Sequence, residues 1–326
     1  MPGGLPRVRL RRMRPLSMLE VFGLAPPGLR AREALFALRG GSGVPPTRFG
    51  LSSLSIFQPR LSVETWLGRR RADRRIPIYN LFNRTPTPLS EGWSVRKRQV
   101  RDFRGGTLTY DSHNGTDFAI PVGTMVTAAA PGKVLRISSE FNRGGLKIFI
   151  DHGEGLATTS NHLGRALVSV GDVIARGQPI ALSGYSGIDG LIAFPWSVPH
   201  VHFNVWLDGE YVDPFATPGE APLWRDGNDP LPEGEVRGEP FEPTAWDPRR
   251  LDDAIAACTD AATRAELAAE PDLPRRAMNL LFQRNYYPNR FSARPALTGD
   301  AHPRAPRLTV PFSPEDFVGI LLPPLD

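Results

Sequence analysis

The central part of this chain is a series of short apolar runs separated by turn residues. From about residue 91 to residue 215 these runs recur at roughly the 8- to 12-residue spacing typical of all-β proteins. Each run is too short for an amphipathic helix, so the pattern favours β-strands. The predicted strands are 107–110, 125–129, 132–138, 146–151, 157–162, 172–174, 179–183 and 200–207. The sequence therefore predicts a mainly β fold, with an antiparallel sheet or sandwich as its core.

The segments on either side of this core lack the strand pattern. Residues 1–90 are rich in Arg, Gly and Pro, and we expect an irregular N-terminal arm with one short helix at 30–38. Residues 216–326 begin with a Pro- and acid-rich stretch. One helix is predicted to start at Asp247-Pro248 and to stop at Pro271, and a second to span 275–282. We therefore divide the chain into 1–90, 91–215 and 216–326, with a partly helical C-terminal extension.

The charge pattern leaves two interpretations of the N-terminal region open. An Arg cluster at 69–75 forms either a patch for an anionic polymer or membrane surface, or a solvated and partly disordered arm. Lys occurs only at positions 97, 133 and 147, which suggests a coding bias toward Arg and weakens the argument from the basic pI. Since no aromatic side chains alternate with the Arg cluster, specific nucleic-acid binding is not expected. The acidic C-terminal flank offers these arginines a contact within the chain.

Cysteine and hydropathy exclude several other classes of protein. The single Cys258 rules out an intrachain disulfide and a Cys-based structural zinc site. No apolar run approaches the 18 residues that a transmembrane helix needs. The basic N-terminus, Arg7 to Arg14, is followed by a poor hydrophobic region, so we recognise no clear signal peptide.

Five of the six histidines lie between residues 113 and 202. His200 and His202 are two positions apart on a predicted strand, so their side chains project from the same face, about 7 Å apart. Such a pair can place one imidazole on a metal and the other beside the metal-bound water. The alternative is a strand with two polar residues that face solvent. His113 and Asp117 lie four residues apart across a glycine turn, and His162 ends another predicted strand.

Each of the remaining candidates also has a structural interpretation. His162 can be a packed core histidine, and Asp117 can cap a turn. We expect His152 to be structural because it lies in a turn, and His302 to be solvated in a Pro-rich tail. The occurrence of several such residues in one segment favours a functional site over these separate explanations.

The whole set of motifs resembles the lysostaphin/LytM-type zinc metalloendopeptidases, which are peptidoglycan endopeptidases. The resemblance covers about residues 107–215, and its parts follow in family order. They are His113-Asn114-Gly115-Thr116-Asp117, Pro121-Val122-Gly123-Thr124, Ala128-Ala129-Ala130-Pro131-Gly132, Ile150-Asp151-His152-Gly153, His162-Leu163, Val170-Gly171-Asp172-Val173, Gly177-Gln178, Ser183-Gly184 and His200-Val201-His202-Phe203.

This resemblance implies a metallopeptidase with a substrate groove and one zinc ion per chain. The implied ligands are His113, Asp117 and His202, with water in the open fourth position. His162 and His200 would be catalytic, handling the proton and stabilising the oxyanion. We expect His200 to be the general base, although the split between the two histidines is not resolved. The implied substrates are stem or cross-bridge peptides of peptidoglycan, which places the protein's action in the cell envelope or outside the cell.

Two departures from the family pattern concern the groove. The segment 188–199 is longer and more apolar than usual, and we expect it to form a wall of the groove. Asn161 stands where a small residue is common before the catalytic histidine. A non-catalytic peptide-binding or regulatory module on the same fold is the alternative function. Because such modules typically lack a ligand and this chain has all three, catalysis is favoured. The hairpin at 171–178 also resembles biotinyl or lipoyl carriers, but it has no lysine to modify.

Overall fold

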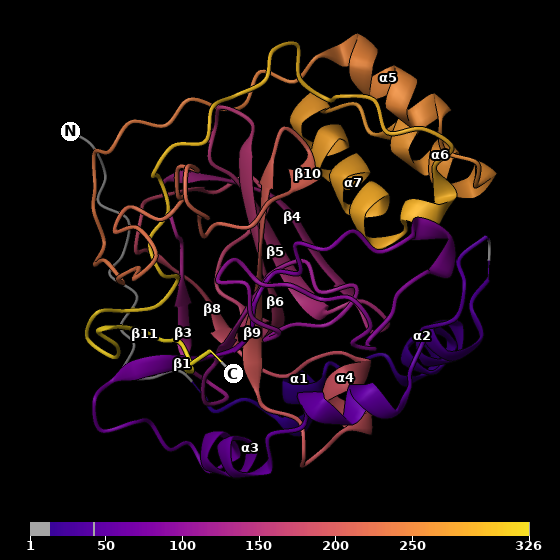
Figure 1. Ribbon diagram of the computed structural model, residues 1–326. Helices are drawn as coiled ribbons and strands as arrows, with labels where there is room; N and C mark the ends of the chain where they lie inside the picture. The colour runs from indigo at the N-terminus through magenta and orange to yellow at the C-terminus, as the bar shows by residue number, and fades with distance from the viewer. Residues whose placement is uncertain (1–13, 42, 326) are drawn as a thin grey trace.

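A strongly twisted sheet runs through the middle of the molecule (Figure 1). The computed structural model describes residues 14–41 and 43–325, so the arginines at 7, 9, 11 and 12 lie outside the described residues. The strands are β1 (Arg75–Asn80), β2 (Thr116–Ala119), β3 (Met125–Thr127), β4 (Gly132–Glu140), β5 (Gly145–Asp151), β6 (Leu156–Ala166), β7 (Val173–Ile174), β8 (Pro179–Ser183), β9 (His200–Leu207), β10 (Glu210–Tyr211) and β11 (Gly319–Leu321).

The sheet is mixed, although most of its pairings are antiparallel. The strand order is β11-β1-β2-β9-β6-β5-β4-β7, with β10 beside β9 and with β8 joining β3 to β6. The pairing of β1 with β11 is parallel. Both strands come from the flanks of the segment 91–215, which we propose as the peptidase domain. The flanks therefore extend the sheet of this domain.

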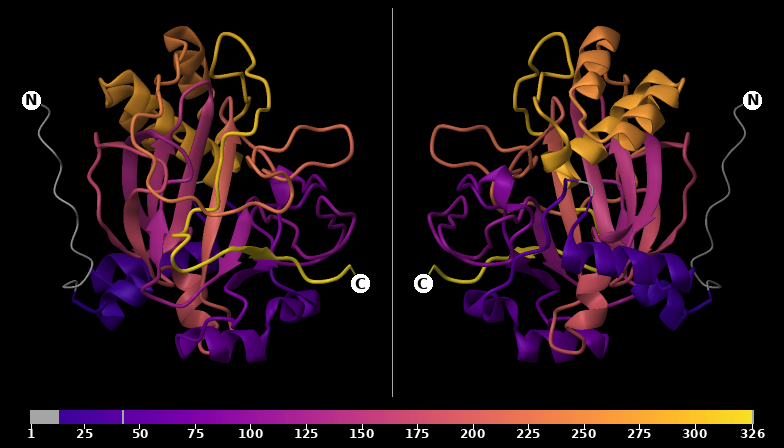
Figure 2. Two further views of the ribbon diagram at one scale, coloured as in Figure 1. Left: turned by 90° about the vertical axis from the view of Figure 1, so that its left-hand side faces the viewer. Right: turned by 90° about the vertical axis from the view of Figure 1, so that its right-hand side faces the viewer.

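Helices cover the sheet at two places. They are α1 (Met18–Phe22), α2 (Pro27–Arg39), α3 (Pro59–Trp66), α4 (Ile188–Ile192), α5 (Pro248–Ala256), α6 (Ala261–Ala269) and α7 (Leu273–Tyr286), with short 3-10 turns η2 (Leu51–Ile56), η3 (Leu89–Glu91) and η4 (Pro288–Arg290). The group α5 to α7 lies together beside the upper part of the sheet, and α1 to α4 lie around its lower end (Figure 2).

Successive side chains of β9 point to opposite faces of the sheet, so the strand contributes to the packing on both faces. Val201, Phe203 and Val205 belong to the main core on one face of the sheet. Trp206 faces the other way and packs with Phe149 of β5 against α7. His200 and His202 share the face of Trp206, because they have the same parity on the strand. The site histidines therefore lie on the face that α7 covers.

The structure confirms the central strands but corrects several expectations. The expected mainly β fold is a mixed architecture in which helix and strand occupy similar shares of the chain. Residues 107–110 form no strand, because the N–H of Thr109 turns back to the carbonyl of Thr107. The helix expected from 247 to 271 is two helices. It is interrupted at Thr259, whose N–H donates to the carbonyl of Arg290, and α6 restarts with Asp260 as its N-cap.

The N-terminal arm is not irregular, since it contains α1, α2, α3 and β1. Several of its arginines form ion pairs with acidic residues of the C-terminal region. These pairs are Arg70–Asp316 at 2.6 Å, Arg75–Asp229 at 3.3 Å and Arg84–Glu220 at 2.8 Å. The expected contact between the oppositely charged flanks is therefore present, while binding of an anionic polymer or membrane surface stays a prediction. None of the described helices has the length and hydropathy to span a membrane.

Candidate functional site

The pairing of β2 with β9 brings the candidate metal ligands together. Asp117 lies directly opposite His202 in the register of these two strands. His113 is held just before β2 by a turn, in which its N–H donates to the carbonyl of Tyr110. The three side chains offer ligand atoms that all lie within 4.8 Å of one another, and all three are buried. Residues 89 positions apart in sequence thus meet in one cluster.

The distances within this cluster fit a tetrahedral metal ion. His113 Nε2 lies 3.0 Å from Asp117 Oδ2, His202 Nδ1 lies 2.7 Å from Asp117 Oδ1, and the two ring nitrogens are 3.2 Å apart. With zinc–ligand bonds of about 2.0–2.1 Å, the ligand atoms of a tetrahedral site are about 3.3 Å apart. Two imidazoles and one carboxylate form a donor set that zinc accepts readily, so the residues present fit this ion.

Hydrogen bonds on the far side of each ring leave the correct nitrogen for the metal. His113 donates its Nδ1–H to the carbonyl of Leu81 at 2.6 Å, which leaves the Nε2 lone pair facing the cluster. His202 directs Nδ1 into the cluster, while its Nε2 faces Asn204 Nδ2 at 2.9 Å and Asn114 Oδ1 at 3.2 Å. Partners of this kind fix the tautomer and the orientation of metal-binding histidines.

Asp117 is an ionised carboxylate inside the protein. Burial acts to raise its pKa, but the neighbouring His113, His200 and His202 hold this pKa well below the ordinary value. Asn80 at the end of β1 donates its Nδ2–H to Asp117 Oδ2 at 2.8 Å, and it thereby orients the carboxylate. The N-terminal flank thus supplies a supporting residue to the cluster.

Replacement of Asn80 by alanine is expected to weaken zinc binding about 10- to 100-fold, the usual cost of removing a group that orients a metal ligand. The affinity is measured by titration with zinc in competition with a chromogenic chelator. Asn142→Ala is the matched control, because Asn142 is also buried beside the same cavity and does not contact Asp117. An unchanged affinity in Asn80→Ala would mean that the carboxylate needs no support from β1.

His200 and His162 lie beside the cluster with matching hydrogen bonds. His200 donates its Nδ1–H to the carbonyl of Val198 at 2.7 Å, and His162 donates its Nδ1–H to the carbonyl of Ser186 at 2.8 Å. Their ring centroids are 4.8 Å apart. In the neutral state, each ring therefore keeps its Nε2 lone pair free to accept a proton. His200 Nε2 lies 3.6 Å from Asp117 Oδ1.

A local distortion of β6 directs His162 toward the other histidines. His162 has a φ of 59°, in the left-handed region that non-glycine residues rarely adopt. The register between β5 and β6 shifts at the same place, since Leu146 pairs with Leu163 whereas Ile148 pairs with Ser160. Such a bulge re-aims a side chain, and strain of this kind is found at functional sites. Burial and the nearby His200 lower the pKa of His162 well below its ordinary value.

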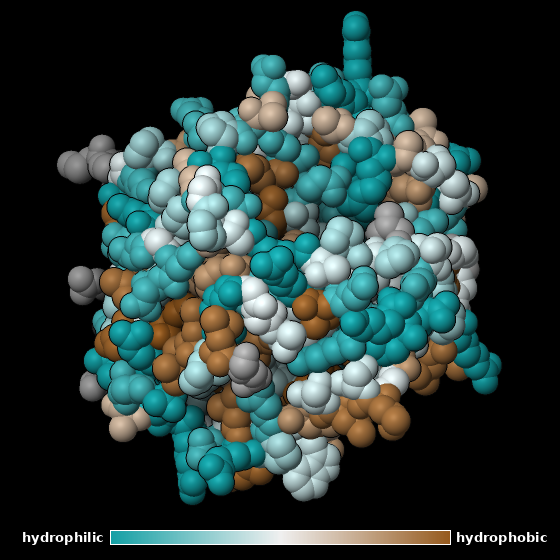
Figure 3. Space-filling model, viewed as in Figure 1, coloured by the Kyte–Doolittle hydropathy of each residue, from teal (hydrophilic) through white to brown (hydrophobic). Residues whose placement is uncertain are grey.

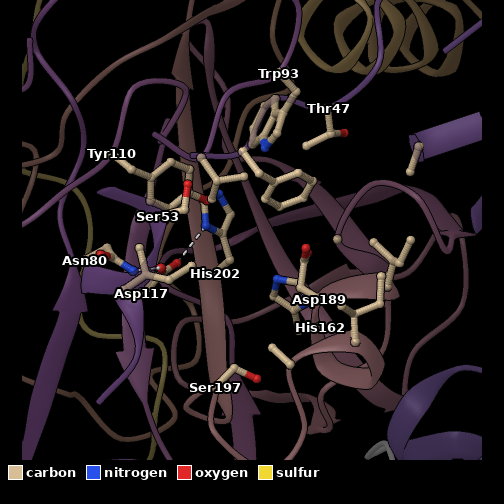
Figure 4. A pocket seen from close by; sticks show the side chains of 18 of the residues that line it. Thr47, Ser53, Asn80, Trp93, Tyr110, Asp117, His162, Asp189, Ser197 and His202 are labelled. Carbon is tan, nitrogen blue, oxygen red and sulfur yellow. Dashed lines mark hydrogen bonds and ion pairs between the residues drawn. The ribbon is translucent and has the colours of Figure 1, made fainter. Parts of the chain in front are cut away.

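The histidines border a cavity of about 360 Å³ (Figure 4). His202, Asp117 and Asn80 lie on one side of it, and His162 and Asp189 lie on the other. The expected wall from segment 188–199 is present, because α4 and the residues that follow it line the cavity. A second wall comes from the N-terminal flank, which the sequence did not indicate. Its lining residues are Thr47, Phe49, Gly50, Ser53, Leu54, Ile56 and Phe57.

The mouth of this cavity has apolar residues on opposite sides. Phe49 is 60% exposed and Leu54 is 61% exposed on the N-terminal wall, and Ile192 is 64% exposed on α4. Figure 3 shows a mainly hydrophilic surface, with apolar side chains gathered over the lower half of the molecule. An exposed apolar rim of this kind suits a peptide that lies across the opening.

The structure separates the other two histidines from this site. His152 is buried, with Nδ1 bonded to the carbonyl of Pro131 and Nε2 bonded to Thr158 Oγ1, both at 2.8 Å. This arrangement agrees with the expected structural role. His302 was expected to be solvated, but its Nδ1 lies 2.6 Å from Asp208 Oδ1 and the ring is only partly exposed.

His152 should make folding stability depend on pH. Burial lowers the pKa of His152 to about 3. In the unfolded chain the imidazole protonates near pH 6.5, so stability is fully present above that pH and is lost as the pH falls toward 3. Between pH 6.5 and 4.5, one such group lowers the free energy of unfolding by about 2–3 kcal/mol. His152→Gln should flatten the pH dependence by about that amount in urea unfolding, and an identical dependence in both proteins would contradict this assignment.

Sequence reasoning missed several residues that complete the site. Asn204 shares the face of His202 by the period of two, and this pattern was available as a signal. Asn80 and Tyr286 carried no such signal because they come from the two flanks. The hydroxyl of Tyr286 on α7 lies 3.0 Å from Asn204 Oδ1 and 3.1 Å from Asn161 Oδ1, and its single proton is shared between these two acceptors. Asn161, which stands where the family commonly has a small residue, thus takes part in a buried polar network with Asn204 and Tyr286.

Comparison with known proteins places these residues among related sequences. Residues 111–214 match the family described as Peptidase family M23. Peptidoglycan DD-endopeptidase ShyA of Vibrio cholerae is 36% identical over 128 residues, which cover 39% of this chain and 28% of that protein. Lysostaphin of Staphylococcus staphylolyticus is 33% identical over 93 residues, which cover 28% of this chain and 18% of lysostaphin.

A third relative has a different function in its name. Murein hydrolase activator EnvC of Escherichia coli is 38% identical over 93 residues, which cover 28% of this chain and 20% of EnvC. The chain thus spans less than a third of each of these three relatives. The family match at residues 111–214 includes the cluster, whereas part of the wall of the cavity lies outside the matched residues.

Proposed function

Because residues 111–214 form a domain of peptidase family M23, we propose that the chain is a zinc-dependent endopeptidase that hydrolyses peptide cross-links of peptidoglycan. The observation that carries this proposal is the buried cluster of His113, Asp117 and His202, which borders a cavity together with two further histidines. The names of the relatives ShyA and lysostaphin support the substrate class. Zinc, when bound, would lower the pKa of a water molecule and polarise the scissile carbonyl.

We assign His200 as the general base. Its Nδ1–H is committed to the carbonyl of Val198, so its Nε2 is free to take the proton from the attacking water. The negative charge of Asp117, 3.6 Å from this nitrogen, favours the protonated ring that results. The same proton can later pass to the leaving amine.

We assign His162 to the stabilisation of the oxyanion. Its ring centroid lies 4.8 Å from that of His200 and 6.4 Å from that of His202. The lowered pKa of His162 makes the free ring neutral, with its Nδ1–H bonded to the carbonyl of Ser186. Its Nε2 can donate to an oxyanion only when it holds the proton that His200 has taken from the attacking water, before that proton passes to the leaving amine.

The function is tested by incubating the zinc-loaded protein with purified cross-linked muropeptide dimers of known linkage and identifying the products by mass spectrometry. We expect conversion of dimers to monomers by hydrolysis of one cross-link amide. The control is the same protein after removal of zinc by a chelator, and activity should return when zinc is restored. If no dimer of any linkage is cleaved by the zinc-loaded protein, the proposed function is wrong.

The name of the relative EnvC favours a second candidate, a regulatory module that binds peptide without cleaving it. In that case the dimers would bind to the cavity and remain intact. The complete metal-binding triad favours hydrolysis, because a pure binding module has no need to keep three buried ligand groups together.

A further inference from the structure

Arg143 is a buried cation beside the cavity that forms no ion pair with a described residue. It lies in the turn between β4 and β5 and is only 6% exposed. The other deeply buried basic side chains have acidic partners, as Lys147 has in Glu140 and Arg284 has in Glu210. A buried charge without a counter-charge is costly, so its retention calls for an explanation.

The contacts of Arg143 hold its guanidinium in a fixed position. Nε donates to the carbonyl of Tyr286 at 3.3 Å, and Nη1 donates to the carbonyl of Asn142 at 2.9 Å. The guanidinium also lies over the rings of Trp93, at 5.6 Å, and Tyr287, at 5.4 Å. Stacking of this kind orients the group and offsets part of the cost of burial. The side chain is therefore ordered before any ligand arrives.

Part of the hydrogen-bonding capacity of this guanidinium is unused. Arginine has five N–H groups, and two of them bond to the carbonyls of Tyr286 and Asn142. The remaining ones, on Nη1 and Nη2, have no acceptor among residues 14–41 and 43–325. Adjacent N–H groups on the two terminal nitrogens form the fork that a carboxylate occupies in a bidentate pair. Burial lowers the pKa of Arg143, but an arginine remains charged at neutral pH.

The guanidinium of Arg143 lies beside the same cavity as the proposed catalytic histidines. Arg143 lines the same cavity as His162, His200 and Asp189. Its neighbour Gly144 accepts the N–H of His162 at 2.8 Å. Asp189 of α4 is near enough for its charge to interact with Arg143, but the two side chains form no ion pair, and burial raises the pKa of Asp189, which disfavours its charged form. A carboxylate that entered the cavity beside the scissile bond would find here the positive group without a partner.

We propose that Arg143 is a substrate-binding residue that receives a free carboxylate close to the scissile bond. This inference rests on the proposed function, because the carboxylate belongs to the peptide that is cleaved. The carboxylate is either the C-terminal group of the peptide or one carried laterally by a residue of the cross-link. The two carboxylates have the same chemistry, and they are distinguished by testing dimers in which only one or only the other is amidated.

The test measures binding, so it does not depend on cleavage. Zinc-loaded protein with the substitution His200→Ala is titrated with cross-linked muropeptide dimers in a calorimeter. One dimer has free carboxyl groups, one has only the C-terminal carboxyl amidated, and one has only the lateral carboxyl amidated. We expect one of the amidated dimers to bind about 10- to 100-fold more weakly, the range for loss of a charge-assisted hydrogen bond. Arg143→Gln should abolish this difference.

Arg290→Gln is the matched control and should keep the preference. Arg290 also stacks on Tyr287, at 4.5 Å, but it bonds to Thr263 and Gln283 and does not line the cavity. Arg143→Lys keeps the charge without the fork and should keep part of the preference. It serves as the second variant if Arg143→Gln unfolds, as judged from thermal melting. Equal binding of all dimers, or a full preference in Arg143→Gln, overturns the inference.

Failure of this inference can be told apart from failure of the proposed function. If wild-type protein cleaves all three dimers equally well, the carboxylate subsite is wrong and the endopeptidase assignment stands. If the binding preference depends on Arg143 but no dimer is cleaved by the wild type, the subsite stands and the catalytic assignment is wrong.

Discussion

Replacement of His202 by alanine is expected to remove zinc from the protein and to abolish cleavage of cross-linked peptides. His202 Nδ1 lies within 3.2 Å of both other ligand atoms, so its loss leaves only His113 and Asp117 to hold the ion. Two protein ligands do not make the three-ligand site of a catalytic zinc. The zinc content, measured by mass spectrometry of the purified protein, should fall from about one ion per chain to a small fraction of that amount.

His302→Ala is the control for this experiment. His302 is paired with Asp208 outside the cluster, so its loss should change neither the zinc content nor the turnover. Thermal melting of both variants separates loss of zinc from loss of the fold. A His202→Ala protein that kept its zinc and its activity would show that the metal is held elsewhere.

Replacement of His200 by alanine is expected to keep the metal and to lower kcat by about 10²- to 10⁴-fold, the usual contribution of a general base. The ligand atoms of His113, Asp117 and His202 stay in place, because His200 bonds to the carbonyl of Val198 and contributes no atom to the cluster. The measurement pairs zinc content with the steady-state kinetics of dimer cleavage. KM should change little, since the ring is assigned to proton transfer.

His162→Ala provides the comparison that separates the two roles. If His200 is the base, its removal should lower kcat by a larger factor than removal of His162 does. The double variant should lose less than the sum of the two single effects, because residues that act in one step are not additive. A His200→Ala protein that turned over within threefold of the wild type would contradict the assignment.

The β-core was readable from sequence because its signal is local. Apolar alternation and glycine turns marked β4, β5, β6, β8 and β9. Of these, β4, β5 and β6 pair in chain order, whereas β8 and β9 both pair with β6. The strands β1 and β11 were missed, because β1 begins at the last residue of the Arg cluster and contains Pro77, and β11 is only three residues long. Residues 107–110 were wrongly predicted as a strand, because their apolar pattern does not reveal the turn that they form. Tyr110 turns toward His113, with 4.6 Å between the ring centroids, instead of continuing a ladder.

The flanks were the least predictable part of the chain. Their Arg and Pro content suggested an irregular arm, yet the ion pair of Arg70 with Asp316 ties the two flanks together. Such a contact joins residues 246 positions apart, and no periodic pattern in the sequence predicts it. The polar network of Tyr286 with Asn161 and Asn204 is of the same kind, since its partners come from three separate segments.

The sequence by itself determined which residues form the metal cluster. A spacing of two along a strand puts His200 and His202 on one face whatever the rest of the chain does, and the motif at His113 and Asp117 completes the donor set. Only the tertiary structure decided what surrounds this cluster. The support from Asn80, the apolar rim and the unpaired Arg143 arise from the packing of distant segments against the sheet. The identity of the ligands was implied by the resemblance of local motifs to a known family, whereas the shape and charge of the cavity depend on contacts that have no sequence period.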